Sequence, residues 1–193
     1  MRVIPMFTVD YFNACLAVVL MISITGCYIQ NPEYPSAWPK IMKTTDVESQ
    51  IEGFYSCTGE ILKNGSGMWE MKSITDFLIG GRTPPVCEYL EISKVQPDSL
   101  EFRYFSSGVE IKKQIYKRDR DYHVQDNWIV LDSIVEVLAQ NIVAVHASMT
   151  PYLITNDEQD LVVKVKNSDL GLIFVIFPSG TFGTEWGKFK RKK

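Results

Sequence analysis

The sequence predicts a mainly β protein, a β-rich α+β fold arranged as an antiparallel barrel or sandwich with about one helix. Apolar and polar residues alternate in the segments 100–104, 109–115 and 161–165, which is typical of strands with one face in water. Short clusters of Asn, Asp, Ser and Gly separate these segments and favour hairpins between antiparallel neighbours. Apolar residues have helical spacing in 68–78, and a pair of glycines follows this segment.

The longest apolar run of the second half, 170–177, reads Leu-Gly-Leu-Ile-Phe-Val-Ile-Phe and predicts a central strand covered on both faces. The polar residues 167–169 before it predict a tight turn, which would make 161–166 and 170–177 a hairpin. All the predicted strands are expected to neighbour one another in one antiparallel sheet system, because each needs a shared core. Further turns are expected at the other polar clusters: 63–67, 96–98, 106–108, 125–127, 156–158 and 178–180.

Composition fits a single folded domain. The chain has 193 residues, 46% of them hydrophobic and 22% charged, with a formal net charge of -3. This hydrophobic content excludes wholesale disorder, and the charge gives no reason to expect nucleic acid as a partner.

The N-terminus has the features of a secretory signal. Residues 14–24 are apolar apart from Ser23, a stretch shorter than the roughly 20 residues that a membrane-spanning helix needs. Arg2 supplies a thin positive region before this stretch, and small residues follow it, as in a signal peptide.

Ile24-Thr25-Gly26-Cys27 resembles the lipobox of bacterial lipoproteins. The resemblance implies that the Cys27 thiol receives a diacylglyceryl group, that the chain is cleaved before Cys27, and that the new amine is acylated, for example with palmitate. The partner would then be the lipid bilayer. Tyr28 stands where an aspartate retains many such lipoproteins in the inner membrane, which favours the outer membrane facing the periplasm. The alternatives are an ordinary signal peptide, or a buried hydrophobic strand with an incidental cysteine.

The expected organisation has three parts. Residues 1–26 form the lipoprotein signal peptide, and 27–45 form the lipidated cysteine and a proline-rich tether, which contains Pro32, Pro35 and Pro39. Such a tether is expected to be extended and to hold the domain away from the bilayer. Residues 46–193 form a single β-rich periplasmic domain.

Two cysteines remain after the signal peptide and Cys27 are set aside. Cys57 and Cys87 are an even pair in a compartment where disulfides persist, so we expect them to be joined. The alternative is two buried free thiols.

No catalytic pattern is recognised. His123 and His146 are not spaced as metal ligands, and neither a nucleophile elbow nor a phosphate-binding loop is present in the sequence. We therefore expect no enzyme activity, no cofactor and no metal. The basic residues of 188–193 would either meet anionic lipid headgroups or form a solvated C-terminus.

Two shorter resemblances concern the domain. Gly53-Phe54-Tyr55 is similar to the Gly-x-Trp start of lipocalins, where a basic residue of the last strand, here Arg191, would pack on the aromatic ring. Tyr55-Ser56-Cys57 is similar to the Tyr-x-Cys of periplasmic lysozyme-inhibitor lipoproteins. The expected function is that of a membrane-anchored envelope lipoprotein with a binding or structural role. The alternatives are a lipocalin-like carrier of a small apolar ligand, or a periplasmic protein inhibitor, so an envelope protein is also a possible partner.

Overall fold

The fold is mainly β, with two short helices and two sheets that pack as a sandwich and do not close into a barrel over the described residues. The computed structural model describes residues 27–30, 32–62, 72–79, 86–140, 143–173 and 177–192. The predicted mainly β fold is therefore confirmed, as a sandwich.

The larger sheet contains eight described strands, antiparallel except for the parallel β1. They are β1 (Cys27–Gln30), β3 (Glu60–Leu62), β7 (Tyr122–Gln125), β8 (Trp128–Leu131), β9 (Ile134–Gln140), β10 (Val143–Thr155), β11 (Leu161–Ile173) and β12 (Phe177–Phe189). Their order is β1-β12-β11-β10-β8-β7, with β3 also paired to β12 and β9 also paired to β10.

The smaller sheet has the order β13-β2-β4-β5-β6. Its strands are β2 (Gly53–Ser56), β4 (Tyr89–Gln96), β5 (Ser99–Ser106), β6 (Val109–Lys117) and β13 (Arg191–Lys192), and the helices are α2 (Val47–Gln50) and α3 (Ile74–Leu78). Only Lys190 separates β12 from β13, so the C-terminal segment crosses directly from the larger sheet to the smaller one.

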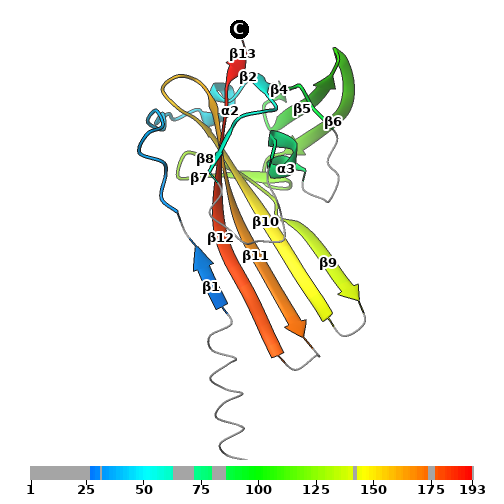
Figure 1. Ribbon diagram of the computed structural model, residues 1–193. Coiled ribbons are helices and arrows are strands. Elements are labelled where there is room, and N and C mark those ends of the chain that lie inside the picture. The colour runs from blue at the N-terminus through cyan, green and yellow to red at the C-terminus, as the bar shows by residue number, and fades with distance from the viewer. Residues whose placement is uncertain are drawn as a thin grey trace, which may run out of the picture.

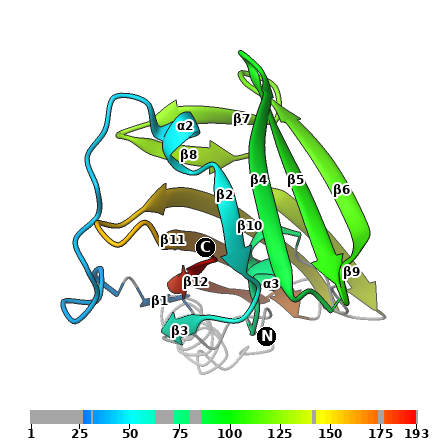
Figure 2. The same cartoon turned by 90° about the horizontal axis from the view of Figure 1, so that it is seen from above.

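The smaller sheet packs against one end of the larger sheet only (Figure 2). The other end projects as an extension of long strands, at whose side β1 lies (Figure 1). We call this extension the blade: β1, β9, and the residues 143–149, 167–173 and 177–183 of the three long strands. The remainder, in which the two sheets face each other, is the head.

Large side chains fill the space between the sheets in the head. The most completely buried include Tyr55, Phe77, Phe102, Tyr104 and Phe189, each less than 2% exposed. Phe77 of α3 meets Phe189 of β12 edge to face, with ring centroids 5.7 Å apart. Gly187 permits this contact, because a Cβ there would lie 2.7 Å from the Phe189 ring. The aromatic core is therefore packed around a position that has no side chain.

The alternating segments all form strands. Segments 100–104 and 109–115 lie in β5 and β6, which pair with each other in the smaller sheet. Segment 161–165 lies in β11 of the larger sheet, so the expectation that all these strands neighbour one another in one sheet system is wrong. The strands divide between two sheets, which bury their apolar faces against each other. The expected turns at 96–98, 106–108, 125–127 and 156–158 are present, and 63–67 lies outside the described residues.

The hairpin expected at 167–169 is wrong. These residues lie in the middle of β11, which pairs without interruption from Leu161 to Ile173 with both β10 and β12. A strand with a partner on each side satisfies its backbone groups, and this outweighs the turn preference of Asn, Ser and Asp. The Asn167 amide also donates to Glu185 Oε1 at 3.3 Å on the neighbouring strand.

The apolar run 170–177 is consequently not one central strand. Its first residues end β11 and its last residue begins β12, with Ile173 paired to Phe177, and 174–176 lie outside the described residues. The turn expected at 178–180 is likewise absent, because these residues belong to β12.

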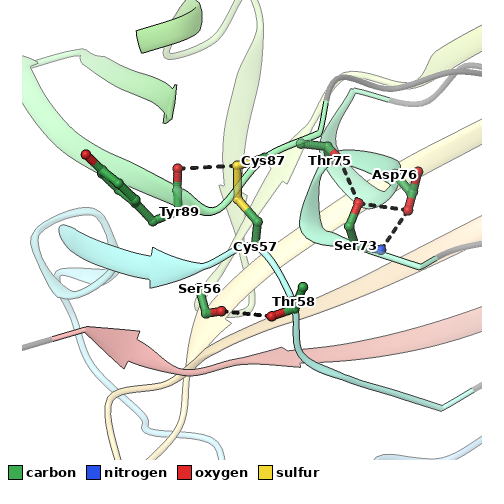
Figure 3. The surroundings of a disulfide bond; sticks show 8 residues. All are labelled: Ser56, Cys57, Thr58, Ser73, Thr75, Asp76, Cys87 and Tyr89. Carbon is green, nitrogen blue, oxygen red and sulfur yellow. Dashed lines mark hydrogen bonds between the residues drawn. A yellow bond between two sulfur atoms is a disulfide. The ribbon is translucent and has the colours of Figure 1, made fainter. Parts of the chain in front are cut away.

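The expected helix 68–78 corresponds to α3 at its C-terminal end, and residues 68–71 lie outside the described part. The Asp76 carboxylate accepts hydrogen bonds from the backbone N–H of Ser73 at 2.6 Å and from its hydroxyl at 2.9 Å (Figure 3). Such a capping arrangement fixes where a helix begins. The other helix, α2, was not expected. It is capped by the Asp46 carboxylate, which accepts from the Ser49 N–H at 3.2 Å.

Candidate functional site

Cys27 lies near the free end of the blade, three residues before the last described pair of β11 and β12. It pairs with Gly180 in the parallel ladder of β1 and β12, and the ladder runs from there toward the head, ending at Gln30 opposite Gly183. Phe189 follows Gly180 by nine residues along β12, so Cys27 lies about 30 Å from the end of this strand at ~3.4 Å per residue. Residues 1–26 lie outside the described part.

The segment after β1 contacts the larger sheet instead of standing off as an extended spacer. The Trp186 indole N–H donates to the Pro32 carbonyl at 3.0 Å, and the Tyr34 ring lies 5.3 Å from the Trp186 ring. Further along, the Met42 N–H donates to the Thr155 carbonyl at 3.0 Å. The proline-rich segment is therefore attached to the strands that it passes, which joins the Cys27 end rigidly to the head.

Cys57 and Cys87 are paired in the structure, with Cα atoms 5.6 Å apart (Figure 3). Cys57 follows β2 and Cys87 precedes β4, so the pair joins two adjacent strand ends. The Cys57 carbonyl accepts the Ile74 N–H at 2.9 Å, and this bond also connects the pair to the start of α3.

An open groove of about 490 Å³ lies where the C-terminal segment passes β2 and β3. Its lining combines three lysines, one glutamate, two hydroxyls and a glycine: Ser56, Thr58, Gly59, Glu60, Lys188, Lys190 and Lys192. Lys188 Nζ lies 3.1 Å from Glu60 Oε1, and Lys192 Nζ lies 5.0 Å from the centre of the Tyr89 ring. Because Lys190 is exposed and cationic, the groove suits an anionic group. The predicted basic C-terminus thus forms β13 and one wall of this groove, in the head and far from the free end of the blade (Figure 1).

Glu48 of α2 is a buried acid of the head that faces three side-chain donors. Its carboxylate accepts from the Tyr122 hydroxyl at 2.7 Å and forms ion pairs with Lys94 at 2.9 Å and Arg118 at 2.7 Å. Burial opposes the charged form, but these three donors outweigh it and lower the pKa of Glu48. The arrangement connects α2 to both sheets, so we interpret it as structural.

Lys164 lies among three aromatic rings on the outer face of the larger sheet. Its Nζ is 4.7 Å from the centre of the Tyr152 ring, 5.3 Å from Trp128 and 5.5 Å from Trp186. Burial, with a contribution from the nearby charge of Lys166, lowers the pKa of Lys164. Cation–π contacts of this kind stabilise a half-buried ammonium group.

The basic residue implied by the lipocalin resemblance is next to its aromatic partner. Arg191 of β13 pairs with Tyr55 of β2, and its guanidinium carbon lies 6.0 Å from the Tyr55 ring. Arg191 also donates to the Glu52 carbonyl. The local pair is therefore present on adjacent strands of the smaller sheet, in a fold that does not close into a barrel over the described residues.

The two histidines are on separate strands, His123 on β7 and His146 on β10, and both are exposed. Within the described ranges, His, Cys, Asp and Glu form no group of three that could hold a metal ion. Among those same residues, no helix has the length and apolar character needed to cross a bilayer.

No family model, no curated protein and no solved structure matches this chain. The function is therefore inferred from its own residues and their geometry.

Proposed function

We propose that this protein is a lipid-anchored, non-enzymatic lipoprotein of the bacterial envelope, and that its blade holds a binding head away from the periplasmic side of the outer membrane. The observation that carries the proposal is the pairing of Cys27 with Gly180 near the free end of the blade. A cysteine at this place, preceded by Ile24-Thr25-Gly26, is suited to lipid attachment without obstructing the head.

The contacts of the segment after β1 give the anchor a mechanical role. Two or three acyl chains at Cys27 would give stable attachment, since each buried CH₂ contributes about 0.8 kcal/mol. The β1–β12 ladder and the Trp186–Pro32 hydrogen bond then fix the anchored end relative to the head. The blade and the part of β12 in the head together place Cys27 about 30 Å from Phe189, at ~3.4 Å per residue.

The binding role is supported by the groove lined by Lys188, Lys190 and Lys192. It lies at the end of the molecule opposite Cys27, and three lysines against one glutamate favour an anionic ligand, such as a carboxylate or phosphate group. The alternative, a carrier of a small apolar ligand, requires space between the sheets. Tyr55, Phe102 and Tyr104 occupy the interior of the head, which favours binding at the surface.

The anchoring proposal is tested by replacing the cysteine that would carry the lipid. In a bacterial host, Cys27→Ala is expected to prevent lipidation, so that the chain keeps its signal peptide or is released from membranes. Cys15→Ala is the matched control, because Cys15 lies in the signal peptide and its loss should leave processing unchanged. Identical processing and membrane attachment of the two variants and the wild type would overturn the proposal.

The binding proposal is tested by affinity capture from detergent-solubilised envelopes. The double variant Lys190→Gln/Lys192→Gln is expected to lose the envelope component that the wild type retains. Lys112→Gln/Lys117→Gln removes the same charge from β6 and should retain it. Equal capture by both double variants would show that the groove is not the binding surface.

A further inference from the structure

The free end of the blade has no charged residues. Val137, His146, Leu170 and Gly180 form one row across β9, β10, β11 and β12. From this row to the described ends of the four strands lie 137–140, 143–146, 170–173 and 177–180, and none of these segments contains an Asp, Glu, Lys or Arg. Charges begin again in the next row toward the head, at Glu136 and Asp169. On β9 and β11 the first charged residues toward the head therefore lie at one level, while β10 carries no charged residue and β12 carries none before Glu185. We call the row from Val137 to Gly180 the boundary row.

Cys27 lies at this same level, because its pairing partner Gly180 belongs to the boundary row. The β11–β12 ladder continues past it to the pair Ile173–Phe177, three residues further. At ~3.4 Å per residue, these strands extend about 10 Å beyond the level of Cys27.

Apolar side chains are exposed on one face of the blade just at the boundary. Val137 is 66% exposed and Leu170 47% exposed, and both flank His146 in the same row. Val135 is 52% exposed, and it points to the same face because it lies two residues from Val137 on β9. Clustered exposed aliphatic side chains are unfavourable in water and mark a surface that is covered by something else.

We propose that the uncharged end of the blade, 137–140, 143–146, 170–173 and 177–180, inserts into the interfacial region of the bilayer as a second membrane contact beside the lipid on Cys27. The inference rests on the proposed lipidation, which places a membrane surface at the level of the boundary row. The bilayer is the occupant that the geometry favours, because the uncharged ends of two strand pairs, β9 with β10 and β11 with β12, lie on the side of Cys27 away from the head. None of these four strands carries an Asp, Glu, Lys or Arg among its described residues on that side, as contact with the boundary of the acyl chains requires.

The strands also limit how deep the insertion goes. β9 is an edge strand over this part of the sheet, and an open edge has unpaired backbone N–H and C=O groups. Such groups are too costly in the hydrocarbon core, where no water can bond them. The inserted part therefore reaches the boundary of headgroups and acyl chains, at a depth of about 5–10 Å. This agrees with the 10 Å by which β11 and β12 pass Cys27.

The test uses the protein isolated from bacterial membranes, reconstituted in vesicles of phosphatidylethanolamine and phosphatidylglycerol. Val137→Cys and Val109→Cys are each labelled with an environment-sensitive fluorophore. These two valines are matched, at 66% and 64% exposed, and Val109 lies in the head at the start of β6. The label at residue 137 is expected to shift to shorter wavelength and to be quenched several-fold more by nitroxide-labelled phospholipids than the label at 109.

Equal quenching at the two positions would overturn the insertion. A blue-shifted label at 137 that lipid nitroxides do not quench would also overturn it, because a protein or a second copy would then cover the surface. The mass of the Cys27 peptide is measured on the same sample. Lipidated Cys27 without quenching at 137 refutes the insertion alone. Quenching at 137 with unmodified Cys27 refutes the proposed anchor and leaves the insertion.

A charge placed at the boundary provides a second measurement. Val137→Glu/Leu170→Glu is expected to increase the transfer of lipidated protein from loaded to empty vesicles several-fold, because the second contact is lost. Val109→Glu should leave the transfer rate unchanged. Equal transfer by wild type, double variant and control would contradict the insertion.

Discussion

Removal of the Glu48 carboxylate tests whether α2 is held to the two sheets as described. The Glu48 side chain is only 2% exposed and faces three donors, whereas the Lys94 and Arg118 side chains are 27% and 43% exposed. In Glu48→Ala the two cations can regain water, but the buried Tyr122 hydroxyl loses its acceptor. Glu48→Ala therefore leaves the buried Tyr122 hydroxyl without its acceptor, while the rest of the network remains partly buried.

The size of the effect follows from these exposures. Three bonds to a charged group at about 1.5–3 kcal/mol each give an upper limit of roughly 4.5–9 kcal/mol. Because two of the donors are partly solvated, we expect a loss near the lower end of the range for broken buried pairs, about 3 kcal/mol. For a chain of this size, that corresponds to a fall in Tm of roughly 6–12 °C.

The assay is thermal unfolding followed by circular dichroism at neutral pH, with Glu110→Ala as control. Glu110 is an exposed carboxylate of β6, so its removal should leave Tm almost unchanged. The pKa of Glu48 is lowered on folding, so its contribution is present above the pKa of the unfolded chain and is lost as the pH falls through the folded pKa. The difference between wild type and Glu48→Ala should therefore shrink in acid. Equal Tm values for the two variants at neutral pH would refute this account of the network.

Three other changes have defined outcomes. Reduction of the Cys57–Cys87 pair, or its replacement by serines, should lower the free energy of unfolding by about 3 kcal/mol, as expected for a closed loop of roughly 30 residues. Non-reducing peptide mapping should find the two cysteines joined, and two alkylatable thiols in the folded protein would contradict this. Gly187→Ala should destabilise the head by about 1–3 kcal/mol in urea unfolding, since the added Cβ meets the Phe189 ring, and an unchanged midpoint would contradict the packing. Ser168→Pro should unfold the blade, because proline breaks a strand that is paired on both sides. Amide hydrogen exchange should then show loss of protection in β10, β11 and β12. Unchanged protection would indicate a turn at this place, which tolerates proline, and would contradict the pairing.

The sequence contains the local information for much of this fold. The alternation of apolar and polar residues correctly predicted the strands around Phe102, Ile111 and Val163, because one buried face imposes a period of two on a strand. The turns at Ser107-Gly108 and Asp126-Asn127 were predictable, because Ser107, Asp126 and Asn127 adopt positive φ and turn chemistry is local. The pairing of Cys57 with Cys87 was predictable because these two cysteines remain once the signal peptide and Cys27 are set aside.

The blade could not be predicted in the same way. Asn167, Ser168 and Asp169 have turn preferences, and only long-range pairing with β10 and β12 shows that they continue a strand. The apolar run from Leu170 has the composition of a buried strand, but its position at the end of two strands depends on topology. The contact between Trp186 and Pro32 spans 154 residues and has no local signal.

Of the candidate sites, the cysteine was predictable from the sequence and the groove was not. Cys27 is recognisable from four adjacent residues, but its level on the blade is known only through Gly180. The groove was not expected, because its lysines come from the C-terminal segment and its hydroxyls from the residues around β2. The clustering of lysines in 188–192 was the available signal.

The most direct test of the anchored blade is the mass of the N-terminal peptide of the protein isolated from bacterial envelopes. The account predicts a mature chain that begins at Cys27, with a diacylglyceryl group on its sulfur and an acyl chain on its amine. A peptide with an unmodified Cys27 thiol, or a mature chain that begins at another residue, would contradict it.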